Sequence, residues 1–157
     1  MPLSITIEDL LSWGPCRDHQ ELCAMAAGRE RWTALDILAL DQPPSDLLWV
    51  VLRPELIPEH VLHELACDFA EHVLHLFEGV HPSEDRPRAA IEAKRAWLRG
   101  EITGKQLMAA ADGAWVAAAV ERAVARAVEA AEAGCGGGNE ERIWQLQHVL
   151  EKCKCVF

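Results

Sequence analysis

The chain of 157 residues contains no tyrosine and only three phenylalanines, and its basic side chains, 15 lysines and arginines, are outnumbered by 25 acidic ones. Contacts to phosphate backbones need clustered lysine and arginine, so a formal net charge of −10 argues against nucleic acid as a partner. The charge suits a basic protein partner better, although surface acid also simply keeps a protein in solution.

Long apolar runs and familiar catalytic motifs are also missing. No stretch approaches the ~18 consecutive apolar residues of a membrane span, and no basic region precedes an apolar core as in a signal peptide. The sequence has no phosphate-binding loop and no GxSxG or HExxH motif. We therefore expect a cytoplasmic protein that has no membrane contact, no cofactor and no enzymatic activity.

The six cysteines include no CxxC pair. In the reducing cytoplasm they should remain free thiols rather than form disulfides. They are Cys16, Cys23, Cys67, Cys135, Cys153 and Cys155. The cysteine pattern thus predicts neither a disulfide framework nor a thiol redox motif.

What is present is helical periodicity. Half of the residues are hydrophobic and a quarter are charged, as in ordinary globular proteins, and the length suits one domain with its own core. No run alternates with the period of a strand. We predict an all-α, single-domain helical bundle over residues 1–157. Its expected parts are short helices (1–55), a hairpin with an alanine-rich helix (56–133), a glycine-rich connector (134–138) and a terminal helix (139–157).

The stretch that organises this bundle runs from Pro58 to Glu78. At ~100° per residue, its apolar side chains share one broad arc of a helical wheel. The arc consists of Leu62, Leu65, Ala66, Phe69, Val73, Leu76 and Phe77, widened by Ala70 and Leu74. Pro58 suits the first helical turn, and Gly79 is expected to end the helix.

A second helix follows after a short loop. Asp85 is its expected cap, Pro87 lies in its first turn and Arg99-Gly100 ends it. Two helices joined by a few residues form an antiparallel hairpin, and this hairpin is the predicted base of the bundle.

The amino-terminal part predicts helices over Ile7 to Trp13, Cys16 to Ala27 and Ala34 to Leu40. The run Leu47 to Leu52 is ambiguous, because a short continuous apolar run suits a buried strand as well as a buried helix. We favour a short buried helix capped by Ser45, since helices are expected on both sides.

After the hairpin, Thr103 and Gln106 form a capping-box pattern that opens the longest predicted helix, Gly104 to Ala133. Its many alanines favour a helix and allow a close neighbour, so we expect an inner helix. Asn139 is expected to cap a last helix from Glu140 to about Lys154, and the tail from Cys153 to Phe157 is expected to fray.

Two patterns could carry chemistry on the central helix. His60, His63 and Cys67 follow at i, i+3 and i+7, and imidazole and thiolate are zinc ligands. The pattern is weak, because a core histidine with one hydrogen bond is commoner. Asp68 and His72 are one turn apart and could work as an acid–base pair, although such pairs are usually surface interactions.

Two further sets of residues could serve binding or stability. Most of the six tryptophans should be core, but Trp32 is expected in an exposed loop as a protein-binding residue. Arg86 or Arg88 could form a structural ion pair with Asp68 or Glu71 of the central helix.

Four segments together resemble the immunity-protein family of bacterial polymorphic-toxin systems. They are ACDFAEHVLHLFE (Ala66 to Glu78), DRPRAAIEAKRAWLRGEIT (Asp85 to Thr103), the alanine-rich helix, and ERIWQLQHVL (Glu141 to Leu150). The resemblance implies a small cytosolic protein that binds and neutralises a cognate toxin without catalysis. It does not extend to about the first 55 residues of the chain.

Alternatives stay open. The hairpin also resembles uncharacterised phage and prophage proteins, so a phage-encoded accessory protein or host-defence inhibitor that binds protein is the second function. A metal or thiol site on the central helix is the third. The sequence leaves open whether the chain forms a homodimer and whether its gene is chromosomal or phage-derived.

Overall fold

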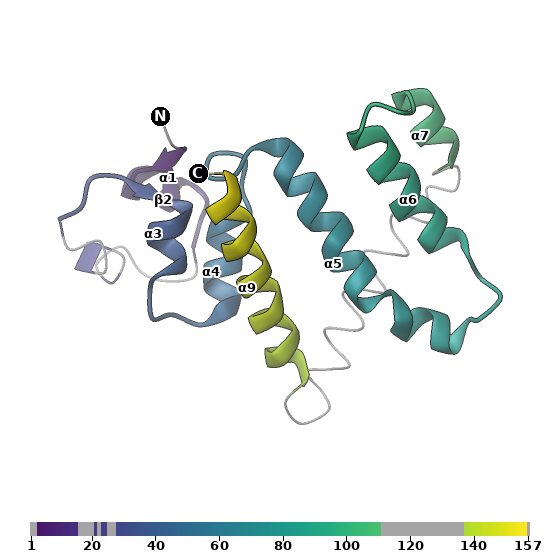
Figure 1. Cartoon of the computed structure of the whole chain (residues 1–157). Helices are drawn as coiled ribbons and strands as arrows, with labels where there is room; N and C mark the ends of the chain where they lie inside the picture. Colours follow the sequence, from purple (N-terminus) through teal and green to yellow (C-terminus); the bar gives the residue numbers. More distant parts are fainter. Residues whose placement is uncertain (1–2, 16–20, 22, 25–27, 111–136, 157) are drawn as a thin grey trace. The chain divides into compact units, whose positions relative to one another are not determined.

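The computed structural model of the chain describes residues 3–15, 21, 23–24, 28–110 and 137–156 (Figure 1). This part of the chain is mostly helical, which confirms the predicted all-α class. Its sheet is a single antiparallel pair of two-residue strands, β1 (Ser4–Ile5) and β2 (Trp32–Thr33). These strands were not predicted, because two residues are too few to show an alternating pattern.

The chain divides into two compact units, residues 1–62 with 143–157, and residues 63–142. Each unit is described by itself below. The predicted single domain over residues 1–157 stays a prediction.

Two short helices of the first unit begin with the same local device. Thr6 caps α1 (Ile7–Ser12), and its hydroxyl and backbone exchange hydrogen bonds with Asp9 in a capping box. Thr33 caps α3 (Ala34–Leu38) in the same way, with Asp36 as its partner. Both predicted starts are confirmed, and both helices end earlier than predicted. The predicted helix over 16–27 lies mostly outside the described residues.

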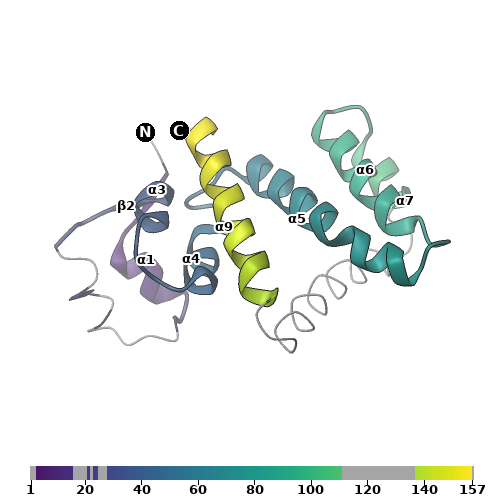
Figure 2. The ribbon, with the colours of Figure 1, turned by 60° about the horizontal axis from the view of Figure 1, so that its bottom comes forward.

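The ambiguous run from Leu47 is helical, in α4 (Pro44–Val51), which packs beside α3 (Figure 2). Its buried side chains are Leu47, Leu48 and Val51. The expected Ser45 cap is wrong. Pro43 is the N-cap residue and Pro44 opens the helix, because a fixed proline φ is already helical and the missing N–H is not needed there.

The last helix of the chain, α9, runs from Gly137 to Val156. Its Val149 and Cys153 are fully buried, and this part of the helix belongs to the first unit. Three expectations need correction. Asn139 lies inside the helix rather than at its cap, Gly137 and Gly138 are helical rather than part of a connector, and the tail stays helical to Val156. Residues 134–136 of the predicted connector lie outside the described residues.

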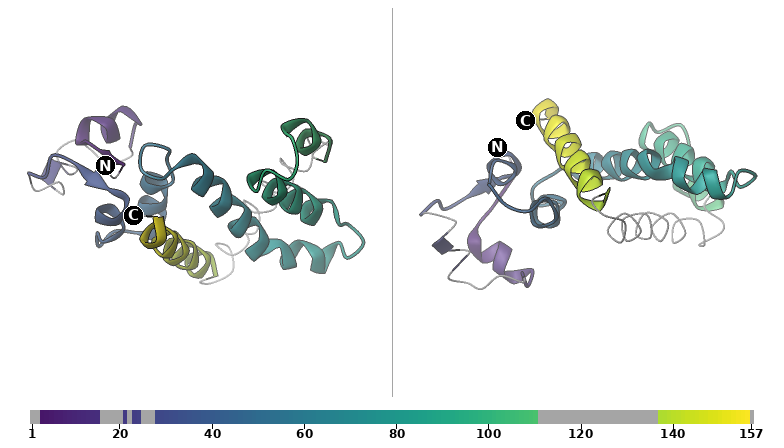
Figure 3. Two further views of the ribbon diagram at one scale, coloured as in Figure 1. Left: turned by 45° about the horizontal axis from the view of Figure 1, so that its top comes forward. Right: turned by 90° about the horizontal axis from the view of Figure 1, so that it is seen from below.

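The second unit contains the predicted hairpin, which is confirmed. Helices α5 (Glu59–Val80) and α6 (Arg86–Leu98) run side by side in opposite directions (Figures 1 and 3). Their contact is an apolar cluster of buried residues from both helices, with Leu98 packed against it. The buried members are Cys67, Ala70, Leu74 and Ile91.

The buried face of α5 is rotated from the arc that the helical wheel suggested. Ala66 is exposed and Leu76 is 51% exposed, although both were placed in the apolar arc. Ala70 and Leu74, placed at its margin, are buried. A wheel shows which side chains are apolar, but the direction of the partner helix decides which of them lose contact with water.

Gly79 does not end α5, which continues to Val80, so this prediction is wrong. Gly100 does end α6. It has a positive φ of 73°, and the backbone N–H groups of Gly100 and Glu101 donate to the carbonyls of Trp97 and Ala96. This is the hydrogen-bond pattern of a Schellman motif. Asp85 is the N-cap residue of α6, although its side chain makes no capping hydrogen bond.

After Gly100 the chain turns into α7 (Gly104–Ala110), which packs against α6. The predicted capping box is confirmed, because Gln106 accepts from the backbone and hydroxyl of Thr103, and the Thr103 hydroxyl accepts from the Gln106 N–H. The rest of the predicted alanine-rich helix, residues 111–133, lies outside the described residues.

Within the described residues, no helix combines the length and the apolar character that crossing a membrane requires.

Gly79 and Gly100 give opposite responses to the same substitution. Neither position has an atom within 4 Å of an added Cβ, so only the backbone conformation matters. Gly100→Ala should destabilise the protein by about 1–2 kcal/mol, because the left-handed conformation is unfavourable for alanine. Gly79→Ala should stabilise it by about 0.5–1 kcal/mol, because alanine loses less entropy in a helix. Urea unfolding measures both, and destabilisation by Gly79→Ala would contradict the helix end at Val80.

Candidate protein-binding surface

A cross-helix ion pair joins the two helices of the hairpin. Arg95 of α6 donates from Nη2 to Asp68 Oδ1 at 2.9 Å, and the same nitrogen is 2.5 Å from Glu71 Oε2. The exposed fractions are 36% for the Arg95 side chain and 20% for that of Asp68. The interaction is therefore partly shielded from water and should contribute more than an ordinary surface pair.

Arg86 or Arg88 was predicted to pair with Asp68 or Glu71, in the place that Arg95 takes in the structure. Arg88 instead makes a two-pronged contact with Glu78, at 2.8 and 2.9 Å, and Arg86 binds Glu84 in the loop before α6. The antiparallel register explains this. The first turn of α6 lies opposite the end of α5, so the acids in the middle of α5 meet an arginine two turns later.

These pairs use much of the hairpin's acidic charge internally. The hydrogen bond from Arg88 lowers the pKa of Glu78, and the hydrogen bond from Arg86 does the same to the pKa of Glu84, so both carboxylates are ionised at neutral pH. Asp85 and Glu92 are exposed and make no ion pair with any described residue. They are the hairpin carboxylates available to a basic partner.

The candidate metal ligands lie in different surroundings. His60 is exposed, His63 contacts the ring of Trp97 with centroids 5.7 Å apart, and Cys67 is buried in the hairpin core. Burial raises the pKa of Cys67, which disfavours the thiolate that a metal would need. No set of three or more His, Cys, Asp or Glu side chains within the described ranges is placed to hold a metal ion. A metal site here stays a prediction that these placements do not support.

The candidate acid–base pair is divided between other partners. Asp68 contacts Arg95, whereas His72 Nε2 lies 3.2 Å from Glu141 Oε2. The other buried thiol, Cys153, has a pKa raised to about 11 by burial alone and is a poor nucleophile.

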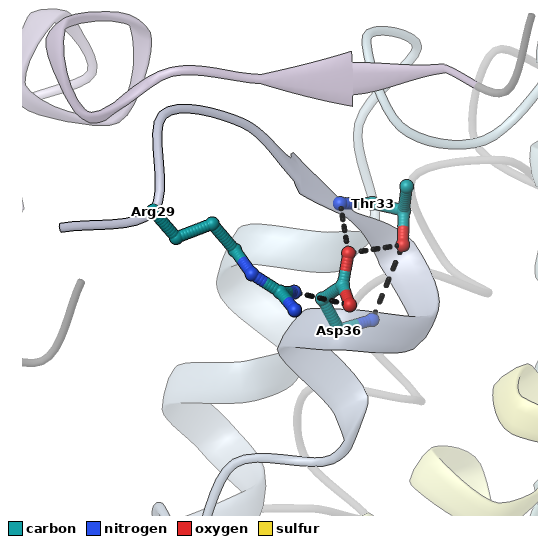
Figure 4. A network of polar contacts seen from close by, with 3 residues as sticks. All are labelled: Arg29, Thr33 and Asp36. Carbon is teal, nitrogen blue, oxygen red and sulfur yellow. Dashed lines mark hydrogen bonds and ion pairs between the residues drawn. The ribbon is translucent and has the colours of Figure 1, made fainter. Parts of the chain in front are cut away.

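Trp32 lies in strand β2, not in a loop, and is half-buried. The guanidinium of Arg29 lies 5.0 Å from its ring centroid and forms an ion pair with Asp36 (Figure 4). The charge of this arginine is thus already matched within the chain. The protein-binding role of Trp32 stays a prediction.

Asp36 accepts hydrogen bonds from both groups of Thr33, at 2.7 Å from the hydroxyl and 2.9 Å from the backbone N–H (Figure 4). These bonds, with a smaller effect of Arg29, hold the pKa of Asp36 below its ordinary value. The network therefore requires an ionised carboxylate at the start of α3.

The first unit also contains a cluster that was not predicted, which we call the tryptophan–arginine cluster (Trp13, Trp49 and Arg53). The Arg53 guanidinium lies 4.3 Å from the Trp13 ring centroid and 4.6 Å from that of Trp49. The two indoles meet edge to face at 6.5 Å. Trp49 is 42% exposed. The i, i+4 spacing of Trp49 and Arg53 was a readable signal, but the position of Trp13 was not.

Tryptophan and arginine are the residue types most enriched at binding hot spots. An exposed indole beside a guanidinium is therefore a candidate contact for another protein. The hairpin surface with Asp85 and Glu92 is a second candidate, of opposite charge.

A family model described as "Imm-5 like putative immunity protein" matches residues 54–134. The matched range includes the α5–α6 hairpin and α7. The tryptophan–arginine cluster precedes it. Neither the curated proteins nor the solved structures contain a match to the chain.

The Arg95–Asp68 pair should couple the two helices energetically. In a double-mutant cycle with Arg95→Met and Asp68→Asn, we expect a coupling of about 1 kcal/mol, from urea unfolding of the four proteins. Arg99→Met with Glu101→Gln is the matched control. That pair joins neighbouring residues at the end of α6 and is more exposed, so its coupling should be smaller. Equal coupling in the two cycles would contradict a shielded pair between the helices.

Removal of the Thr33 hydroxyl should raise the pKa of Asp36. Thr33→Ala should also cost about 1 kcal/mol of stability at neutral pH, as expected for loss of a cap. A carboxyl group whose pKa is lowered by folding stabilises the folded state at a pH above its unfolded-state pKa. This contribution disappears as the pH falls through the folded-state pKa. The difference between wild type and variant should therefore shrink in acid. NMR titration of Asp36 checks the shift, and Thr33→Ser, which keeps the hydroxyl, should restore it. An unchanged Asp36 pKa in Thr33→Ala would refute this account.

Proposed function

The chain belongs to the Imm-5 like immunity-protein family, and from this we propose that it is a non-enzymatic protein that binds and neutralises a cognate toxin. The observation that carries the proposal is the family match over residues 54–134, which covers just over half of the chain. The matched residues include a hairpin whose two helices are joined by apolar packing and ion pairs. Such a joined pair of helices suits a binding surface, because little conformational entropy has to be lost on association.

We further propose that the toxin surface is basic. The net charge of −10 favours attraction to a basic partner. Hairpin acids such as Glu78 are used within the chain, whereas Asp85 and Glu92 are available. In the other unit, exposed carboxylates without an ion pair to the described residues include Glu8, Glu30, Asp41, Glu55 and Glu151.

Neutralisation by binding is supported by the state of the candidate catalytic groups. The Cys67 thiol is buried and has a raised pKa, and Asp68 is held by Arg95. A protein that neutralises a toxin by binding must be present in at least an equimolar amount. An enzyme that inactivated the toxin would be effective at a much lower concentration.

The proposal predicts stoichiometric protection. The toxin encoded beside this gene is held at a concentration far above the dissociation constant, and its activity is measured as the protein is added. Activity should fall linearly to zero at one equivalent, and the two proteins should co-elute. Protection well below one equivalent would indicate a catalytic mechanism. No protection at any ratio would refute the proposed function.

The same pair of proteins tests the charge of the partner. Association should slow with rising salt, because screening weakens attraction beyond ~8–10 Å at about 0.1–0.15 M. The double variant Asp85→Asn with Glu92→Gln should associate more slowly than wild type at low salt. Lys105→Met, which removes an exposed positive charge, should associate slightly faster. Association that does not change with salt would contradict a basic toxin surface.

A further inference from the structure

The guanidinium of Arg53 differs from those of six other described arginines in having no polar partner. Six others contact a carboxylate or a hydroxyl or carbonyl oxygen: Arg29, Arg31, Arg86, Arg88, Arg95 and Arg99. The Arg53 side chain makes neither a hydrogen bond nor an ion pair with any residue that the structure describes, and its Nε is buried without an acceptor. In a chain with 25 acidic side chains, a half-buried guanidinium without a counter-charge needs an explanation.

Two indole rings contact the Arg53 guanidinium. Trp13 and Trp49 lie against it at 4.3 and 4.6 Å from their ring centroids, so its positive charge faces two π-systems. Because the two indole planes are 74° apart, the guanidinium can lie flat on at most one of them, and the donors on its edge away from the rings are not used by these ring contacts. Nε is the only Arg53 nitrogen that is both buried and unpaired. The terminal nitrogens therefore remain open to an acceptor from outside.

We propose that the tryptophan–arginine cluster binds a carboxylate side chain of the toxin, with the Arg53 terminal nitrogens donating to it and the exposed Trp49 ring packing beside it. A carboxylate matches the paired donors of a guanidinium, and the indoles exclude water from the pair, which strengthens it. This inference rests on the proposed function and adds to it the chemistry of one contact.

Charge favours this occupant over the alternatives. A polyanion such as nucleic acid or an anionic membrane would be repelled by the net charge of −10. A second copy of the chain carries the same charge and would be repelled as well. The occupant must be attracted to the chain at long range and must match Arg53 locally. A single acidic side chain on an otherwise basic toxin meets both conditions.

The position of the cluster suggests that it determines which toxin is bound. Its three residues precede the matched range 54–134, so they lie outside what the family model covers. Long-range attraction to acidic residues allows many basic surfaces to bind, whereas a guanidinium held against two rings requires one acceptor at one place. The cluster thus supplies specificity, and the acidic surface supplies attraction.

Substitutions in the cluster test the inference against the toxin encoded beside the gene. Arg53→Met and Trp49→Ala should each weaken binding roughly tenfold or more, as expected for loss of a charge-assisted contact or an aromatic anchor. Arg53→Lys should not restore binding, because an ammonium has no planar pair of donors, whereas Trp49→Phe should keep most of it. Arg29→Met is the control. It removes the same charge from an arginine stacked on a tryptophan, but that arginine is already paired with Asp36. Circular dichroism confirms that each variant is folded.

A second measurement does not need the toxin. The side-chain N–H signals of Arg53 and the indole N–H signals of Trp13 and Trp49 are followed by NMR during addition of N-acetyl-glutamate amide, and in parallel of the neutral N-acetyl-glutamine amide. Only the carboxylate should give a saturable shift, and Arg53→Met should abolish it. Equal responses to both compounds, or tight toxin binding by folded Arg53→Met, would overturn the inference. Dimerisation in sedimentation that Arg53→Met abolishes would also overturn it. Failure of the wild type to neutralise the toxin, with the carboxylate shift intact, would refute the proposed function instead.

Discussion

The packing of α5 on α6 is the constraint on which the rest of the hairpin depends. Small side chains on α5, Cys67 and Ala70, allow α6 to approach closely enough to bury Ile91. Once these apolar groups meet, the antiparallel register is set, and with it every polar contact across the hairpin. Arg95 then reaches Asp68, and the first turn of α6 brings an arginine to Glu78. The ion pairs therefore follow from the apolar contact rather than create it.

Charge is distributed unevenly with respect to this packing. Within the hairpin, acids and arginines largely satisfy one another, so the acidic surface offered to a partner is smaller than the net charge suggests. In the first unit Arg53 shows the opposite arrangement, a cation held by aromatic rings without a carboxylate. A protein that binds one toxin needs both general attraction and a contact that rejects wrong partners. Under the proposed function, the acidic surface and the tryptophan–arginine cluster would have these two roles.

Local interactions within about one helical turn were readable from the sequence. The capping box at Thr103 formed as predicted, and the predicted helix starts at Ile7 and Ala34 follow capping boxes at Thr6 and Thr33, since each device consists of residues three positions apart. The hairpin was predictable for the same reason, because its two helices have their own starts and a short loop. The preference for a helix over Leu47 to Leu52 also held, although the cap was misplaced. A family resemblance carried by these helices was readable as well.

Contacts between distant residues were decided only by the tertiary structure. Gly79 is suited to end a helix, but α5 continues past it, whereas Gly100 ends α6 through hydrogen bonds of its own turn. The sequence indicated Asp68 as an ion-pair acid but not Arg95 as its partner, because the partner depends on the register between two helices. The tryptophan–arginine cluster needed Trp13 to come near the end of α4, which no local pattern records. The sequence thus determined the helices and their starts, while the direction from which each helix is covered decided its buried face, its ion pairs and the candidate binding contact.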